Sequence, residues 1–100
     1  MVRIHQYWVY ILTNAGHSMF YVGVTNDLHR RVHEHRAMED KESFTARYRV
    51  LKLVYYERHQ WINEAIAREK KVKRWGKEWK RDLVNGMNPE WKDLLVDFRE

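Results

Sequence analysis

Runs of aromatic and β-branched residues predict the first two elements of the chain. Residues 7–12 (Tyr-Trp-Val-Tyr-Ile-Leu) form an almost unbroken apolar run, which is typical of a buried strand. Residues 19–24 form a second such run, and the polar segment between the two contains Asn14 and Gly16, both of which tolerate the positive φ of a tight turn. The pattern therefore predicts a β-hairpin at the start of the chain.

The segment after the hairpin predicts a helix, a loop and a third strand. The helix begins after Asn26 or Asp27, either of which can cap it, and runs to about Met38. Residues 39–47 are polar, which is typical of a loop. Residues 49–57 alternate between apolar and polar positions, as a strand with one buried face does.

The second half of the chain is predicted to be helical. Three segments are expected, over residues 61–75 (with Asn63 as the alternative start), 77–84 and 89–95. Gly76 stops the first helix, the second ends near Asn85-Gly86, and Pro89 can begin the last turn. The order β-β-α-β-α-α predicts an α+β fold, in which helices flank a small three-stranded antiparallel sheet.

Composition narrows the class of protein. One hundred residues, 44% of them hydrophobic, correspond to a single folded domain over residues 1–100. The sequence contains no cysteine, which excludes disulfides and thiolate chemistry. It also contains no apolar stretch of transmembrane length and no signal-peptide region, so we expect a cytoplasmic protein that does not act at a membrane.

The charge of the chain favours a polyanionic partner. The formal net charge is +5, and residues 69–81 contain seven Lys or Arg against two Glu. Such cations either follow a phosphate backbone or are simply solvated, and the pattern alone does not separate the two. Four of them are candidate nucleic-acid contacts: Lys70, Lys73, Arg74 and Lys77.

The hairpin and the helix after it contain four candidate catalytic side chains. Tyr10 and Tyr21 are separated by ten residues on the two predicted strands, and are either core aromatics or reactive phenols. Gly23 follows within the second strand, where glycine often marks the close approach of backbone or ligand, so it is a further candidate nucleic-acid contact. Arg31 and His35 are four residues apart and therefore share a helix face, which is either a solvated basic face or part of a site.

Glu69 is unusual because its position on the long helix should be apolar. It lies on the face formed by Ile62, Ala65, Ile66 and Val72. A buried carboxylate needs a compensating charge. It could form an ion pair with Arg31, extend to solvent, or bind Mg²⁺, which proteins commonly hold by one or two carboxylates.

The ordered set of these residues resembles the GIY-YIG nuclease superfamily, in particular its branch of small single-domain predicted endonucleases. The similarity extends from about Tyr7 to Leu94. It implies that the conserved positions of that family are occupied here by Tyr10, Tyr21, Gly23, Arg31, His35 and Glu69. It further implies Mg²⁺-dependent cleavage of DNA phosphodiester bonds, with Glu69 as the metal ligand and Mn²⁺ as an alternative metal.

The chain departs from the family pattern at several positions. The first motif tripeptide of the family, Gly-Ile-Tyr, corresponds to Trp8-Val9-Tyr10 here, so Trp8 replaces its glycine. Val24 stands where repair nucleases of the superfamily have lysine. The late asparagine of several relatives has only Asn85 and Asn88 as candidates. The sequence does not decide whether Tyr10 or Tyr21 removes the proton from the attacking water. It also does not decide whether RNA is a substrate as well as DNA.

Two other classes of function are compatible with the sequence. The first is a nucleic-acid-binding module that does not cut, or that cuts only with a protein partner that supplies selectivity. The second is a protein-interaction domain that uses exposed aromatic residues. A structural zinc site at His29 and His33 is not expected, because no third ligand follows at a suitable spacing.

Overall fold

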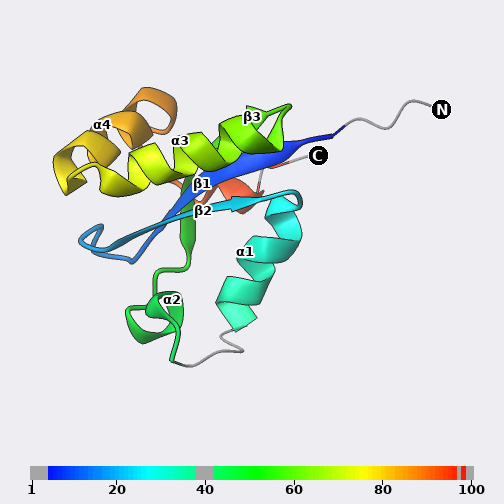
Figure 1. Cartoon of the computed structure of the whole chain (residues 1–100). Coiled ribbons are helices and arrows are strands. Elements are labelled where there is room, and N and C mark those ends of the chain that lie inside the picture. The colour runs from blue at the N-terminus through cyan, green and yellow to red at the C-terminus, as the bar shows by residue number, and fades with distance from the viewer. Residues whose placement is uncertain (1–4, 38–41, 97, 99–100) are drawn as a thin grey trace.

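A three-stranded antiparallel sheet lies between two layers of helices (Figure 1). The structure is a computed structural model that describes residues 5–37, 42–96 and 98. The strands are β1 (Tyr7–Thr13), β2 (Phe20–Thr25) and β3 (Lys52–His59), and the sheet order β2-β1-β3 places β1 in the centre. The first two strands form a hairpin, so the predicted α+β fold and its sheet are confirmed.

Four helices and one short 3₁₀ turn complete the described fold. They are α1 (Leu28–Ala37), α2 (Phe44–Arg47), α3 (Ile62–Arg74), α4 (Lys77–Met87) and η1 (Leu94–Val96). Helices α1 and α2 lie on one side of the sheet, and α3 lies on the other (Figure 1). Within the described ranges, none of these helices is long and apolar enough to cross a membrane.

Strand β1 is buried on both faces, which explains its unbroken apolar run. Trp8, Tyr10 and Leu12 share a core with residues of α1. Val9 and Ile11 share the opposite core with residues of α3 and α4. The central strand therefore connects two hydrophobic cores, and Tyr10 belongs to the one on the α1 side.

The prediction of a loop over residues 39–47 is wrong for its second half. Helix α2 forms there because the Ser43 hydroxyl accepts a hydrogen bond from the backbone N–H of Ala46 at 3.2 Å, which caps the helix. Thr45 anchors this short helix because its side chain is buried. The predicted helix end at Met38 lies outside the described residues.

The ends of the C-terminal helices also differ from the prediction. Helix α4 continues past Asn85-Gly86 to Met87, since an exposed glycine in a helix costs only about 1 kcal/mol. The backbone N–H of Asn88 then donates to the carbonyl of Val84 at 2.6 Å. Pro89 does not begin a helix, and η1 is the only remaining turn of helix in the described part.

The hairpin turn uses a residue that the sequence did not indicate. His17 has a positive φ of 55°, whereas no described glycine does. The carbonyl of Asn14 accepts a hydrogen bond from the N–H of His17 at 3.1 Å, and its side-chain oxygen accepts one from the N–H of Ser18 at 2.9 Å. The Asn14 side chain thus organises the turn while a neighbour adopts the left-handed conformation.

Candidate active site

The two tyrosines lie on neighbouring strands and point to the same face of the sheet. Tyr10 pairs with Gly23 and Tyr21 pairs with Leu12, so their side chains are diagonal neighbours with ring centroids 6.2 Å apart. Tyr10 is only 1% exposed on the central strand, whereas Tyr21 is half-buried on the edge strand β2. Of the two phenols, Tyr21 is therefore the one that solvent or a substrate can reach.

The phenol of Tyr10 occupies the space that a side chain at position 23 would need. A Cβ built at this position would lie 2.5 Å from the Tyr10 hydroxyl and 2.6 Å from Cζ. Neither distance is compatible with a real side chain. The close approach that a glycine within a strand predicts is thus made by the phenol of Tyr10, and a contact between Gly23 and nucleic acid stays a prediction.

His35 links the buried tyrosine to α2. Its Nε2 lies 3.1 Å from the Tyr10 hydroxyl and its Nδ1 lies 3.1 Å from Oγ1 of Thr45. Its ring also packs edge-on against Tyr21, with centroids 4.9 Å apart. The side chain is buried between these partners and therefore has a single orientation.

The protonation state of His35 follows from its surroundings. Burial lowers the pKa of His35 to about 4, the positive charge of Arg31 adds to this effect, and Glu34 opposes it. The imidazole is therefore neutral near pH 7, so one ring nitrogen donates and the other accepts. Tyr10, His35 and Thr45 consequently form one continuous hydrogen-bonded chain.

Tyr10 is held in its neutral form. Burial raises the pKa of Tyr10 well above its ordinary value, Tyr21 raises it further, and Arg31 only partly offsets both. A phenol in this state donates a hydrogen bond but does not readily give up its proton. We conclude that Tyr10 is suited to orienting its neighbours.

Arg31 lies beside both phenols. It interacts electrostatically with Tyr10 and Tyr21, and its Nη1 forms an ion pair with Glu34 at 3.1 Å. Burial lowers the pKa of Arg31, but its interactions with Tyr10, Glu34 and Tyr21 together raise it above the ordinary value. The guanidinium is thus a permanent positive charge at the tyrosine pair.

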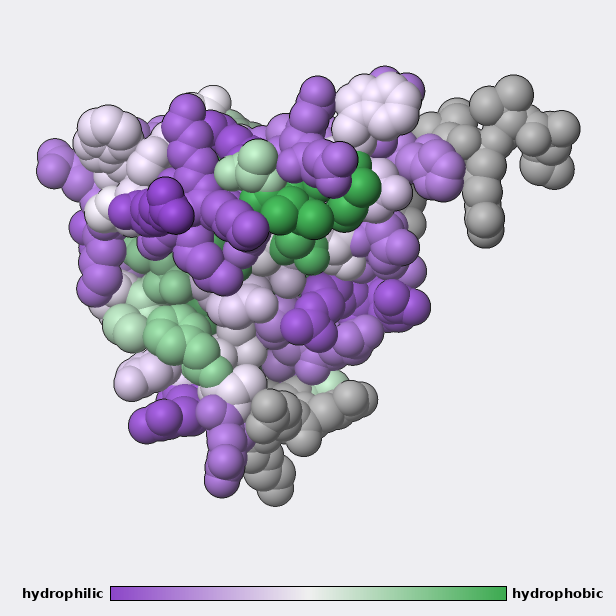
Figure 2. All heavy atoms as spheres, in the orientation of Figure 1, coloured by the Kyte–Doolittle hydropathy of each residue, from purple (hydrophilic) through white to green (hydrophobic). Residues whose placement is uncertain are grey.

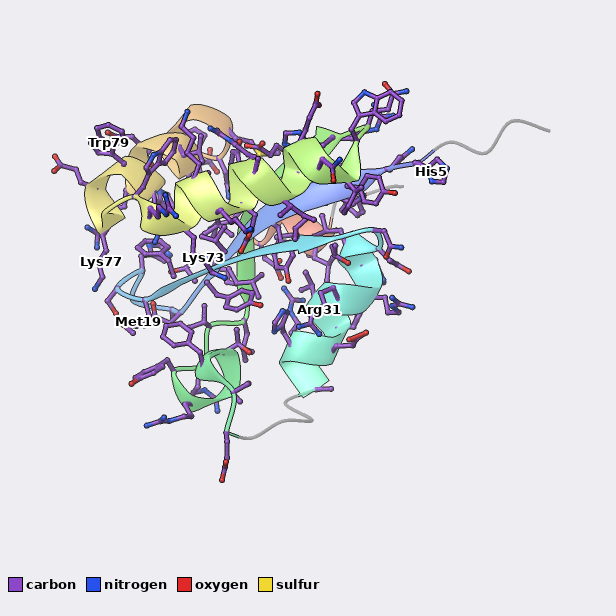
Figure 3. All side chains as sticks on the ribbon, viewed as in Figure 1. His5, Met19, Arg31, Lys73, Lys77 and Trp79 are labelled. Atoms are coloured by element: carbon purple, nitrogen blue, oxygen red, sulfur yellow. The ribbon has the colours of Figure 1, made fainter. Side chains whose placement is uncertain are left out.

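Glu69 lies in the opposite layer of helices, and its ion-pair partner Lys73 interacts with Tyr21. The Glu69 side chain is 12% exposed and pairs with Nζ of Lys73 at 2.9 Å, so the partner is Lys73 and not Arg31. The hydrogen bond from Lys73 to Glu69 raises the pKa of Lys73, and Tyr21 also contributes. Arg31 on α1 and Lys73 on α3 lie on either side of β2 (Figure 3), and Tyr21 interacts with both.

Glu69 is the candidate metal ligand of this site, and one carboxylate is suited to at most one hard cation such as Mg²⁺. In the described part of the chain, no group of three His, Asp or Glu side chains is arranged to hold a metal. Glu69 is a mostly buried carboxylate whose ion-pair partner, Lys73, is itself largely exposed and can move away. A single carboxylate that is completed by water and substrate phosphate is a common arrangement for Mg²⁺.

The candidate nucleic-acid contacts gather along α3 and the start of α4. Lys70, Lys73, Arg74 and Lys77 are all exposed, and hydrophilic surface covers this region (Figure 2). Burial lowers the pKa of Lys80, and the nearby charges of Lys73 and Lys77 lower it further. Like charges therefore accumulate beside Glu69, which favours an anionic ligand there.

The two asparagine candidates have structural partners. The Asn88 side chain donates to the carbonyls of Val54 at 3.1 Å and Lys92 at 2.8 Å. Asn85 accepts a hydrogen bond from the indole of Trp91 at 2.7 Å. The bond from Asn88 to Val54 fixes the C-terminal turn against β3, so both asparagines take part in structural hydrogen bonds.

Sequence reasoning missed Thr45 and the partner of Glu69. Thr45 lies in a segment that was predicted to be a loop, and only the Ser43 cap could have indicated a helix there. The spacing of Glu69 and Lys73 is a stronger signal, because a Glu four residues before a Lys on a helix favours an ion pair.

Comparison with known proteins identifies relatives of the whole domain. The model of the GIY-YIG catalytic domain matches residues 6–82. A UPF0213 protein of Haloquadratum walsbyi is 34% identical over 78 residues, which are 78% of this chain and 85% of that protein. The solution NMR structure of a UPF0213 protein from Bacillus halodurans has a TM-score of 0.55 and 25% identity, covering 88% of this chain and 92% of the other. The family match spans every residue of the candidate site.

Proposed function

The chain belongs to the GIY-YIG catalytic domain family, and we propose that it is a metal-dependent endonuclease that hydrolyses phosphodiester bonds of DNA. The observation that carries this proposal is the placement of two cations around Tyr21. Arg31 of α1 and Lys73 of α3 both interact with Tyr21, and Lys73 forms an ion pair with Glu69. A phenol, a fixed cation and a carboxylate are the groups that hydrolysis with a single metal requires.

Tyr21 is the better candidate for the general base. It is half-buried at the sheet edge and interacts with two cations, Arg31 and Lys73. Tyr10 is buried, and its hydroxyl is engaged with His35. We assign Tyr21 the removal of a proton from the attacking water, directly or through a second water, and Tyr10 the positioning of Tyr21 and His35.

Arg31 and Glu69 have complementary tasks. Arg31 stabilises the negative charge that develops on the phosphoryl oxygens. Glu69 is the residue that would hold Mg²⁺, or Mn²⁺ in its place, and such an ion would supply positive charge to the reacting phosphate group. Lys73, which pairs with Glu69 and interacts with Tyr21, would contact the substrate phosphates if Glu69 held a metal ion.

The alternative is a nucleic-acid-binding module that does not cut. The cluster of Lys73, Lys77 and Lys80 would serve such a module equally well. A binder, however, does not need a mostly buried carboxylate within an electropositive surface, because Glu69 weakens the attraction of phosphates. Glu69 therefore favours hydrolysis.

Cleavage and binding assays separate the two functions. Labelled single-stranded, duplex, nicked and branched DNA, together with RNA, would be incubated with Mg²⁺, Mn²⁺ or EDTA. A nuclease cuts at least one substrate with metal, stops in EDTA, and loses activity in Arg31→Ala. Salt-sensitive binding that is indifferent to EDTA, without cleavage of any substrate, would instead establish a binding module.

A further inference from the structure

Helix α2 presents two large aromatic rings to solvent. Phe44 is 40% exposed and Tyr48, the residue that follows the helix, is 44% exposed. Their ring centroids are 4.9 Å apart, so the two rings form a continuous aromatic surface. Apolar surface is visible in this region, near Met19 of the hairpin turn (Figures 2 and 3). Exposed aromatic pairs of this kind are typical of binding surfaces.

Two arginines lie beside the aromatic surface. The guanidinium of Arg47 lies over the Tyr48 ring, 5.7 Å from its centroid, and both Arg47 and Arg49 are exposed. In the part of the chain that the structure describes, no carboxylate pairs with Arg47, Arg49 or Lys52. We call Phe44, Arg47, Tyr48 and Arg49 the α2 platform.

One side of the platform opens onto a cavity of about 640 Å³. Tyr48, Arg49 and Lys52 line it together with the hairpin turn, and this volume falls within the usual range of ligand pockets. The lining also contains Asp93, but Arg36 neutralises its carboxylate at 2.7 Å. The charge that remains for a ligand is therefore positive.

The backbone holds Arg49 in an uncommon conformation. Its φ is 53°, a region that non-glycine residues rarely adopt. The N–H of Arg49 donates to the carbonyl of Ala46 at 3.3 Å, and the N–H of Val50 donates to the carbonyl of Thr45 at 2.9 Å. Local strain that is fixed by its surroundings is characteristic of functional positions.

The platform is connected to the candidate active site through one side chain. Thr45 lies next to Phe44 on α2, and its hydroxyl is 3.1 Å from Nδ1 of His35. His35 in turn contacts both tyrosines. The platform is therefore adjacent to a buried threonine that is hydrogen-bonded to the histidine between the two tyrosines.

We propose that the α2 platform binds an unpaired segment of the DNA substrate, so that the preferred substrates contain single-stranded DNA beside the cleaved bond. Exposed bases stack on Phe44 and Tyr48, while Arg47, Arg49 and Lys52 contact the phosphates. The bases of an intact duplex are stacked on one another and offer no free face to these rings. This inference rests on the proposed function and names the substrate class of the same site.

Binding measured in EDTA tests the platform without cleavage. Fluorescence anisotropy would compare a labelled single strand with the same strand in a duplex, for the wild-type protein, Tyr48→Ala, Phe44→Ala and Arg49→Asn. Asparagine is chosen at position 49 because it tolerates a positive φ. Trp61→Ala is the matched control, since Trp61 is a 60% exposed aromatic at the start of α3 that does not line the cavity.

Tyr48→Ala should weaken single-strand binding by about 5- to 100-fold, the range for aromatics that stack on bases. Duplex binding should change by no more than about twofold, as for an exposed residue without a stacking role. Trp61→Ala should leave both affinities unchanged. An oligonucleotide containing 2-aminopurine should also lose fluorescence when it binds the wild-type protein, and this quenching should disappear in Tyr48→Ala.

Equal affinities of the wild-type protein for single strand and duplex would overturn the proposal, and so would a Tyr48→Ala variant that binds like Trp61→Ala. If the protein cuts DNA but Tyr48→Ala does not weaken its binding of single strands, the proposed nuclease function stands and the proposed role of the α2 platform is wrong. If the protein cuts no DNA but Tyr48→Ala weakens its binding of single strands, the proposed role of the α2 platform stands and the proposed nuclease function is wrong.

Discussion

The hydroxyl of Tyr10 lies 3.1 Å from Nε2 of His35, on the buried side of the tyrosine pair. Tyr21 packs against the same imidazole with the edge-on geometry of an aromatic contact. The two tyrosines therefore differ in their surroundings. The Tyr10 hydroxyl is fixed in a hydrogen-bonded chain, whereas Tyr21 lies at the edge of the sheet and interacts with Arg31 and Lys73.

Removal of each tyrosine hydroxyl should therefore have a different effect. Tyr21→Phe should lower the cleavage rate by about 100-fold or more, because it removes the base. Tyr10→Phe should retain more activity but lower the free energy of unfolding by about 1–2 kcal/mol, because His35 loses a buried partner. Single-turnover cleavage and urea denaturation measure both effects. A larger rate loss in Tyr10→Phe than in Tyr21→Phe would reverse the assignment.

Thr45 should act by positioning His35. Thr45→Val keeps the shape of the side chain but removes the hydroxyl that contacts Nδ1, whereas Thr45→Ser keeps the hydroxyl. We expect the valine variant to lower the cleavage rate by about 10-fold and to shift the pH dependence, as loss of a supporting hydrogen bond to a site histidine does. The serine variant should restore most of the rate. Equal losses in both variants would mean that Thr45 acts only through packing.

His35 should make the fold sensitive to mild acid. Its pKa is lowered to about 4 in the folded protein by burial and by Arg31, so the unfolded chain binds a proton more readily below pH 6.5. The stability that the neutral imidazole contributes is complete above pH 6.5 and is lost as the pH falls to about 4. The total is about 3–4 kcal/mol, because the pKa of His35 falls from 6.5 to about 4 and each pKa unit corresponds to about 1.4 kcal/mol.

Urea denaturation at several pH values measures this loss. His35→Gln, which cannot titrate, should show a smaller decline in stability between pH 6.5 and 4. The loss of stability that remains in His35→Gln is then due to protonation of carboxylates. Parallel curves for the wild-type protein and His35→Gln would contradict the assignment of the pH dependence to this residue.

Gly23 should tolerate no side chain. Gly23→Ala places a methyl group 2.5 Å from the Tyr10 hydroxyl, so it should destabilise the protein by about 1–3 kcal/mol and lower activity as Tyr10 is displaced. Gly86→Ala is the matched control, because Gly86 is an exposed position of α4 with open space around it. That variant should be more stable by about 0.5–1 kcal/mol. Denaturant titrations of both variants provide the comparison.

The sheet could be predicted from sequence because its signals are local. The apolar run of residues 7–12 and the turn around Asn14 specify the hairpin without any long-range information. The ends of α4 and the presence of α2 depend on tertiary contacts. Asn88 ends α4 by bonding to β3, and Thr45 anchors α2 by bonding to His35. Propensities of single residues contain no information about these partners.

The candidate site could be predicted only in part for a similar reason. Spacing identifies Arg31 and His35 as neighbours on one helix face, and the helical period shows that Glu69 is out of place. The partner of each charge depends on which helices approach β2. The structure pairs Arg31 with Glu34 and Glu69 with Lys73, and it separates the roles open to Tyr10 and Tyr21 by burial.

The most direct test of the account is the Mg²⁺-dependent cleavage rate of Glu69→Gln, measured together with its DNA affinity. Glu64→Gln serves as the control, because Glu64 is an exposed carboxylate on the same helix. The account predicts that Glu69→Gln loses cleavage while DNA affinity and folding are retained, and that Glu64→Gln cuts like the wild-type protein. Normal cleavage by Glu69→Gln would contradict the assignment of the metal site, and with it the central claim.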